Sequence, residues 1–199
     1  HTIRLKPDAK PFAIFTPRRV AVNLMPQLRQ HLDQLLRMRV IRRVDQPTPW
    51  CAGIVVLPKK TSGIRMCVDL TRLNDSVLRE QYTLPAIDQM LARMTGAKLF
   101  SKLDCNSGFY QMPLSPESQL LTTFTTPFGR FCYQRLPFGL CSASEVYQRK
   151  ICDLIDGLDG VLCLIDDVLI FGETKAQHDA CLHEVLQRFR QANITLNDK

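Results

Sequence analysis

The chain has 199 residues, of which 45% are hydrophobic and 23% are charged, and its formal net charge is +7. This is ordinary globular composition, with enough apolar side chains for a substantial core. No stretch approaches the roughly 20 consecutive apolar residues of a membrane helix, and no charged segment followed by an apolar one opens the chain. We therefore expect no membrane span and no secretory signal. Because the first residue is His and not Met, we expect a segment of a longer protein.

The first segments predict an extended arm, a helix and a hairpin. Residues 1–26 contain prolines and are expected to be extended. Residues 27–43 place leucines at helical spacing with arginines on the other faces, which predicts an amphipathic helix. The stretch GIVVLPKKTSGIRMCVDL (53–70) predicts two strands joined by a turn with a basic tip.

The middle of the chain mixes helices and strands. A short helix is expected over residues 84–96, with Pro85 near its start and Gly96 near its end. AKLFSKLD predicts a strand that ends on Asp104. Three further stretches are strand-like, namely FYQMPL (109–114), LLTTFTT (120–126) and RFCYQRL (130–136).

The last third predicts a helix over residues 142–156, a hairpin and a final helix. A possible capping box, Thr174 to Gln177, begins the final helix. Its expected core stripe consists of Leu182, Val185, Leu186 and Phe189. Because strands and helices are mixed and do not strictly alternate, the predicted fold class is α+β.

The positive charge is concentrated in the first third of the chain. Residues 1–65 contain 13 Lys and Arg against 3 Asp and Glu, whereas residues 66–199 contain 13 against 16. This distribution favours a surface that binds a polyanion beside a centre that binds cations. Contact with nucleic acid is one interpretation, and a solvated basic helix face is the other.

The eight cysteines show no zinc-finger pattern, because no two of them are two or three residues apart. We expect buried free thiols in a reducing compartment. His178, Cys181 and His183 lie close together but at no common zinc spacing, so we assign them to the surface and core side of a helix.

Two acids interrupt the apolar stretch VLCLIDDVLIF. Asp166 and Asp167 separate VLCLI from VLIF by two residues, which is the spacing of a tight β-hairpin. Turn chemistry would favour Gly there, and two adjacent carboxylates repel each other unless a cation offsets their charge. A broken local rule of this kind often marks function, although a hydrated hairpin tip is the simpler interpretation.

A third carboxylate strengthens the functional interpretation. If the strand that ends on Asp104 pairs beside the hairpin, Asp104 reaches the Asp166–Asp167 pair, and neither motif offers a balancing Lys or Arg. Such a cluster of oxygen ligands suits Mg²⁺ or Mn²⁺. Two such ions about 4 Å apart are a known device for phosphoryl transfer.

Basic and aromatic residues near these acids fit the same chemistry. Lys59, Lys60 and Arg65 could neutralise a triphosphate, although lysines in a turn are often only solvated. Phe109 follows Asp104 by five residues. Its ring is either part of the core or a rigid group that excludes a sugar 2′-hydroxyl.

Five motifs together resemble a reverse transcriptase domain, most closely that of gypsy-like long-terminal-repeat retrotransposons, from about Pro11 to Lys199. They are PWCAGIVVLPKK, IRMCVDLTRLN, FSKLDCNSGFYQMPLSPES, TTFTTPFGRFCYQRLPFGL and LIDDVLIFG. The resemblance implies the fingers and palm of a right-hand polymerase, with helices packed on an antiparallel palm sheet and no thumb. The implied segments are an arm (1–26), fingers (27–82 and 116–140) and palm (83–115 and 141–199).

The same resemblance implies roles for individual residues. Asp104, Asp166 and Asp167 would bind the catalytic metals, and the backbone carbonyl of Cys105 would face one of them. The other implied roles concern the nucleotide: Lys59 and Arg65 would grip the triphosphate, Phe109 would screen out ribonucleotides, and Phe138 and Gly139 would lie beside the nascent base pair.

Two positions depart from the family pattern. Leu164 stands where the family usually has Tyr, two residues before the first hairpin acid, which affects how the primer end is positioned. Ser144 stands where relatives often have Pro, at the start of a helix.

The expected function is RNA-directed DNA polymerisation within a retroelement polyprotein that carries ribonuclease H downstream. Its partners would be an RNA template, a DNA or RNA primer and deoxynucleoside triphosphates, and its cofactor two Mg²⁺ ions or Mn²⁺. The family implies an intracellular, cytoplasmic particle. The alternatives are an RNA-dependent RNA polymerase and a decayed or domesticated remnant that only binds nucleic acid.

Overall fold

A computed structural model describes residues 1–59, 63–79, 91–164 and 167–197 of the chain. The chain folds into two compact units, and each unit is assembled from two separate segments. The first unit comprises His1–Arg79 and Met112–Ala143, and the second comprises Glu80–Gln111 and Ser144–Lys199.

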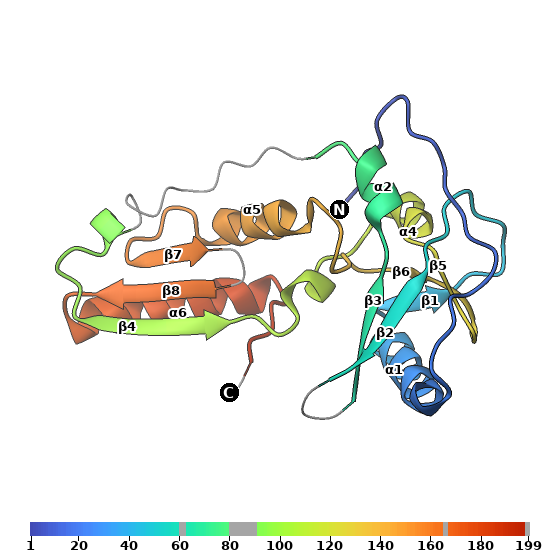
Figure 1. Cartoon of the computed structure of the whole chain (residues 1–199). Coiled ribbons are helices and arrows are strands. Elements are labelled where there is room, and N and C mark those ends of the chain that lie inside the picture. Colours follow the sequence, from blue (N-terminus) through green and yellow to red (C-terminus); the bar gives the residue numbers. More distant parts are fainter. Residues whose placement is uncertain (60–62, 80–90, 165–166, 198–199) are drawn as a thin grey trace. The chain divides into compact units, whose positions relative to one another are not determined.

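The first unit contains a three-stranded sheet, a separate hairpin and short helices (Figure 1). The sheet has the order β1-β6-β5 and is antiparallel throughout, and β2 and β3 form an antiparallel hairpin. The helices are η1 (Val22–Leu24), α1 (Met25–Arg37), α2 (Thr71–Ser76) and α4 (Pro116–Leu121). The strands are β1 (Ile41–Arg43), β2 (Ile54–Pro58), β3 (Ile64–Val68), β5 (Phe124–Thr126) and β6 (Gly129–Tyr133).

An aromatic cluster forms the centre of the first unit's core. The ring of Phe124 stacks on that of Phe131 at a centroid distance of 5.9 Å and lies 5.4 Å from that of Tyr133. All three rings are at most 3% exposed. The apolar stripe of α1 is buried as its spacing predicts, through Leu28, Leu32 and Leu35.

The helix expected over residues 27–43 is shorter than predicted. It ends at Arg37, and Arg39 follows with a φ of 53°, which is left-handed backbone that stops a helix. The chain then enters β1, where Ile41 pairs with Tyr133 of β6 and is 1% exposed. Tertiary pairing of a β-branched residue therefore overrides the local helical pattern here.

The second unit is built on a three-stranded antiparallel sheet of order β4-β8-β7. Its strands are β4 (Leu99–Asp104), β7 (Val161–Leu164) and β8 (Asp167–Gly172). Its helices are η2 (Gly108–Gln111), α5 (Ala143–Ile155), which starts at the unit boundary, and α6 (Lys175–Gln191). The mixture of helices with antiparallel sheets confirms the predicted α+β class.

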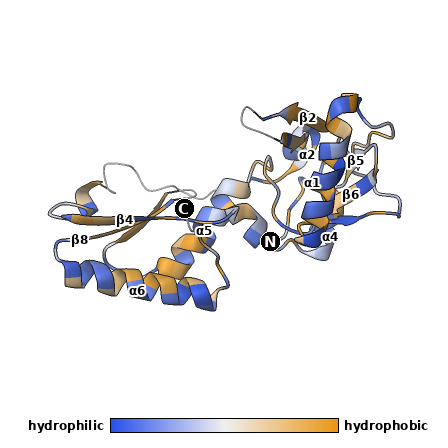
Figure 2. Cartoon of the chain, turned by 90° about the horizontal axis from the view of Figure 1, so that it is seen from below, coloured by the Kyte–Doolittle hydropathy of each residue, from blue (hydrophilic) through white to orange (hydrophobic). Residues whose placement is uncertain are grey.

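Helices α5 and α6 lie on the same side of this sheet in the two views (Figures 1 and 2). Side chains alternate between the faces of a strand. On the face covered by α6, Val168 and Ile170 are at most 1% exposed. Ser101, directly opposite Ile170, bonds to His178 of α6, which identifies the covered face. Leu164 belongs to the opposite face and is 43% exposed, so that face is open at this end.

Several other predicted elements differ from the structure. FYQMPL was expected as a strand, but Gly108–Gln111 form the 3₁₀ helix η2, because the Phe109 ring turns inward against Tyr147. LLTTFTT is a strand only from Phe124, since α4 extends to Leu121. Leu186 was expected in the core but is 40% exposed.

The expected helix over residues 84–96 lies partly outside the described residues. Residues 91–93 are helical. Gly96 has a φ of 85°, a left-handed backbone conformation that favours glycine at the end of a helix. The eight cysteines are free, and most are buried or half-buried as expected, but Cys67 is exposed because its side chain faces outward from the hairpin.

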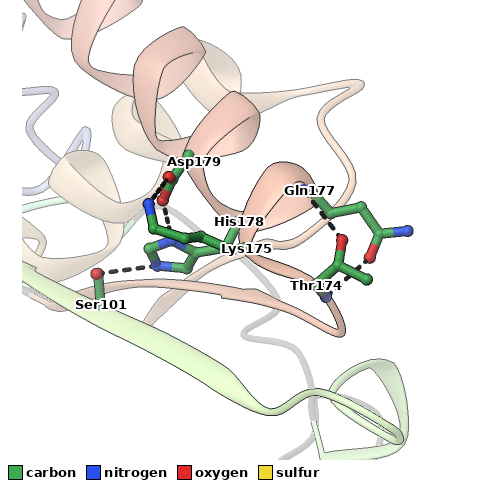
Figure 3. Close-up of polar contacts among 6 residues, drawn as sticks. All are labelled: Ser101, Thr174, Lys175, Gln177, His178 and Asp179. Carbon is green, nitrogen blue, oxygen red and sulfur yellow. Dashed lines mark hydrogen bonds and ion pairs between the residues drawn. The ribbon is translucent and has the colours of Figure 1, made fainter.

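Helix α6 begins with the predicted capping box (Figure 3). The Gln177 backbone N–H donates to Thr174 Oγ1 and the Thr174 backbone N–H donates to Gln177 Oε1, both at 3.3 Å. One turn later His178 contacts Ser101 Oγ through Nε2 and Asp179 Oδ1 through Nδ1, both at 3.0 Å. Hydrogen bonds from Lys175 and then His178 lower the pKa of Asp179.

His178, Cys181 and His183 lie on helix α6, as predicted. His178 is buried against the sheet, Cys181 is half-buried and His183 is exposed. No group of three His, Cys, Asp or Glu side chains among the described residues could hold a metal ion.

Replacing Thr174 by Ala should lower the free energy of unfolding by about 1 kcal/mol, because an orphan backbone N–H at the start of α6 loses its acceptor. Urea unfolding of the chain measures this loss. Thr174→Ser keeps the accepting oxygen and should retain most of the stability. Equal losses in the two variants would contradict the role of the hydroxyl group.

Within the described ranges, no helix has both the length and the apolar character that crossing a membrane requires.

Candidate metal-binding active site

The register of the β7–β8 hairpin decides where the two adjacent acids lie. Leu164 pairs with Asp167, and Cys163 pairs with Val168. Asp167 is therefore paired within the strand ladder and does not lie in the turn, where both acids were predicted. Burial explains the difference, because this register places Cys163 and Val168 together on the covered face, where they are 4% and 1% exposed.

Asp167 is thus the first residue of β8, and Asp104 lies directly opposite it at the end of β4. The expected pairing of the Asp104 strand beside the hairpin is confirmed. Directly opposed residues share one face of a sheet, with Cβ atoms about 5 Å apart. The shared face is the open one, since both acids are out of phase with Val168. Asp166 lies outside the described residues.

Lys102 provides a counter-charge that the sequence interpretation missed. Its Nζ lies 2.9 Å from Asp167 Oδ2, and both side chains are about half exposed. The hydrogen bond to Asp167, reinforced by the charges of Asp167 and Asp104, raises the pKa of Lys102. The expectation that no Lys or Arg balances the acids is therefore wrong. The signal was present, because Lys102 precedes Asp104 by two residues and a strand places both on one face.

Asn197 is a second contact that the sequence interpretation missed. Its backbone N–H donates to the Asp104 carbonyl oxygen at 2.9 Å, and its Nδ2 donates to Asp104 Oδ2 at 2.7 Å. The preceding residue, Leu196, forms an antiparallel bridge with Cys105. No local sequence pattern indicates this contact, because Asn197 and Asp104 are 93 positions apart in the chain.

Cys105 and Phe109 follow Asp104 in the same unit, and both are buried. Cys105 is 5% exposed and Phe109 is 7% exposed. The Phe109 ring meets the Tyr147 ring edge-on at a centroid distance of 5.5 Å. Phe109 is therefore a buried ring of the second unit that packs against Tyr147.

The remaining predicted nucleotide-binding residues belong to the first unit. Arg65 is an exposed residue of β3, opposite Leu57, and the Lys59 backbone N–H closes the same hairpin on Gly63 at 3.0 Å. Lys60 lies outside the described residues. The structure therefore places Lys59 and Arg65 on one hairpin.

The side-chain amide of Asn74 in α2 makes two hydrogen bonds to the backbone of the loop that contains Phe138 and Gly139. Asn74 Nδ2 donates to the Gly139 carbonyl at 2.8 Å, and Asn74 Oδ1 accepts from the Cys141 backbone N–H at 2.9 Å. Gly139 has a φ of 92°, which requires glycine, and the Phe138 ring is 48% exposed.

The chemistry of this donor set fits a hard divalent cation. Asp104 and Asp167 are solvent-accessible carboxylates on one face, and carboxylate oxygens are the ligands that Mg²⁺ and Mn²⁺ prefer. The ion pair of Lys102 with Asp167 shows that this carboxylate is accessible to a positively charged group.

Comparisons with known proteins agree with this arrangement. The family model described as "Reverse transcriptase (RNA-dependent DNA polymerase)" matches residues 57–199. The Retrovirus-related Pol polyprotein from transposon opus of Drosophila melanogaster is 34% identical over 183 residues, which are 88% of this chain and 18% of that polyprotein. The corresponding polyprotein from transposon gypsy is 31% identical over 176 residues, which are 84% of this chain and 17% of the polyprotein.

A viral relative and a solved structure extend the comparison. The Enzymatic polyprotein of Cauliflower mosaic virus (strain CM-1841) is 32% identical over 173 residues, 85% of this chain and 26% of that protein. The foamy viral protease-reverse transcriptase in complex with RNA/DNA hybrid has a TM-score of 0.82 at 23% identity, over 95% of this chain and 25% of that chain. This similarity shows a fold of the fingers and palm type. The chain spans about a quarter or less of each of these proteins.

The family match over residues 57–199 and the polyprotein relatives confirm the predicted resemblance, and the chain belongs to the reverse transcriptase (RNA-dependent DNA polymerase) family, with Pol polyproteins of gypsy-like retrotransposons among its relatives.

Proposed function

We propose that this chain forms the fingers and palm of an RNA-directed DNA polymerase that copies an RNA template into DNA. The first unit would be the fingers and the second unit the palm. The observation that carries the proposal is the pair of opposed carboxylates, Asp104 and Asp167, on the open face of a sheet in a chain of this family. The polyprotein relatives support a retroelement origin. A ribonuclease H domain downstream and a cytoplasmic particle as the setting are further parts of this proposal.

Asp104, Asp166 and Asp167 would hold two Mg²⁺ ions, or Mn²⁺, with the Cys105 carbonyl nearby. When bound, such ions would favour loss of the primer 3′-hydroxyl proton and attack of that oxygen on the α-phosphate, with pyrophosphate as the leaving group, and would offset the charge that develops there. The chain's own part is to present carboxylate oxygens from two adjacent strands at fixed spacing. Lys102 would leave Asp167 when a divalent cation binds, because the Lys102 ammonium group and the cation compete for the same carboxylate oxygen atoms.

Residues of the first unit would bind the incoming deoxynucleoside triphosphate. Arg65 and Lys59 project from one hairpin and would pair with the phosphates, for which the planar Arg fork gives bidentate geometry. Phe138 and Gly139 would border the new base pair, and the exposed Phe138 ring supports a stacking contact. Phe109 would screen the sugar, and its packing against the Tyr147 ring supports a steric role.

The chain should add a deoxynucleotide to a DNA primer annealed to RNA when Mg²⁺ or Mn²⁺ is present. The assay is single-nucleotide incorporation at low ionic strength, where contacts with phosphates are strongest. The Asp166→Asn variant should lose the product, and ribonucleotides should be used poorly. Equal product from the wild-type chain and Asp166→Asn would contradict a metal role for the hairpin. Equal use of ribonucleotides would favour an RNA polymerase.

Primer and template should bind even when catalysis is lost. A chain that binds the RNA–DNA duplex but incorporates nothing with either metal would instead support the alternative of a nucleic-acid-binding remnant.

A further inference from the structure

The segment that follows α6 returns to the catalytic strand by a defined turn. Asn193 adopts left-handed backbone with a φ of 56°. Its N–H donates to the Arg190 carbonyl at 3.1 Å, and the Ile194 N–H donates to the Phe189 carbonyl at 2.8 Å. These are the two hydrogen bonds of a Schellman motif, in which Asn is one of the few residues that tolerate the left-handed position. The turn directs Thr195, Leu196 and Asn197 back along β4.

A set of hydrogen bonds that does not involve Asn197 then fixes this segment. The Asn106 backbone N–H donates to the Thr195 carbonyl at 3.0 Å. The Gln111 side chain accepts from the Thr195 backbone N–H at 2.8 Å and donates to the Thr195 carbonyl at 2.9 Å. The same Gln111 amide donates to the Asn106 carbonyl at 2.8 Å. These hydrogen bonds therefore fix the backbone next to Asn197 without any contribution from the Asn197 side chain.

The Asn197 side chain uses this position to hold one oxygen of Asp104. Its Nδ2 donates to Oδ2 at 2.7 Å while its backbone N–H donates to the Asp104 carbonyl. Asp104 is exposed, and rotation of a carboxylate about its terminal bond is nearly free without a partner. The hydrogen bond to Oδ2 restricts this rotation, and Asn197 makes no contact with Oδ1.

Asn197 and Lys102 differ in how each of them holds its acid. Lys102 carries a charge on a flexible stem that is 62% exposed, so a divalent cation can displace it from Asp167. Asn197 is neutral and does not repel a cation, and its main chain is tied to Asp104. A neutral donor can remain in place when the metal arrives, as the outer-shell partners of metal ligands do.

We propose that Asn197 is a positioning residue that orients the Asp104 carboxylate for a divalent cation. The inference rests on the proposed function, because it assigns the metal to Asp104. The competing explanation is that Asn197 only fastens the segment after α6 to β4. The two explanations differ in their effect on metal affinity, since a fastening residue influences stability and leaves the affinity for the cation unchanged.

The test is direct binding of Mn²⁺ to the chain, followed by the electron paramagnetic resonance signal of the free ion. Asn197→Ala should weaken binding at the Asp104 site about tenfold, the lower end of the range for outer-shell partners. Its urea unfolding midpoint should stay close to that of the wild-type chain. Asn197→Gln retains an amide donor and should recover part of the affinity. Binding that survives in Asp104→Asn is subtracted as adventitious.

Thr195→Ala is the matched control, because Thr195 holds the segment through main-chain atoms and its side chain should be dispensable for metal binding. Wild-type Mn²⁺ affinity in a folded Asn197→Ala variant overturns the inference and leaves the proposed function standing. If Asn197→Ala does not fold, the comparison passes to Asn197→Ser, which lacks the amide donor. Wild-type Mn²⁺ affinity in a folded Asn197→Ser variant then supports only the fastening role. A wild-type chain that binds no Mn²⁺ above the Asp104→Asn background overturns the proposed function and this inference together.

Discussion

Asp167→Asn should lower metal-dependent nucleotide incorporation at least about 10³-fold while the chain stays folded. The substitution keeps the shape of the side chain but removes the negative charge that would hold a divalent cation. Metal stabilisation of a phosphoryl-transfer transition state contributes several kcal/mol, and each 1.36 kcal/mol is a factor of ten in rate. Single-nucleotide incorporation under saturating substrate measures the loss, and circular dichroism verifies the fold.

The Asp179→Asn variant provides the control for this prediction. Asp179 is also an exposed carboxylate of the second unit and also pairs with a lysine, Lys175, but it lies on α6. Its replacement should leave incorporation within about twofold of the wild-type rate. Comparable losses in the two variants would mean that total charge matters and that the position of Asp167 does not.

Phe124→Ala should destabilise the first unit by about 3–5 kcal/mol, the usual cost of removing a buried aromatic ring. Phe124 is 0% exposed and contacts the rings of Phe131 and Tyr133, so the cavity left behind cannot fill with water or collapse readily. The protein has one tryptophan, Trp50, which is 4% exposed in the same unit. Its fluorescence during urea unfolding therefore reports on this unit.

Phe15→Ala tests whether the loss comes from burial. Phe15 belongs to the same unit and is 92% exposed, so the identical substitution should change stability by less than about 0.5 kcal/mol. A similar shift of the Trp50 transition in both variants would contradict the account of the core.

The sequence predicted the elements whose signals are local. The capping box at Thr174 and the apolar stripe of α1 need only neighbours within one or two helical turns, and both appear as expected. The pairing of the Asp104 strand with the hairpin was inferred from chemistry, because three acids had to converge, and the strands do lie side by side.

Predictions failed where distant contacts decide the outcome. Local periodicity extended α1 through Ile41, but pairing with Tyr133 makes that segment a strand. Turn spacing placed both acids of the hairpin at its tip, but burial of Cys163 and Val168 moves Asp167 into β8. Asn197 had no local signal, since its contact with Asp104 depends on how α6 ends and on the hydrogen bonds of Gln111.

The hairpin of β7 and β8 also limits how this protein can change during evolution. Inserting or deleting one residue within β8 would turn Asp167 beneath α6 and expose Val168 to water. Such a mutation would therefore remove the acid and disrupt the hydrophobic layer in one step. Insertions or deletions that keep both faces of β8 in place must therefore involve an even number of residues, or must lie beyond Gly172. Selection for a buried hydrophobic layer therefore also preserves the position of the acids on the opposite face, although none of the buried side chains takes part in the chemistry.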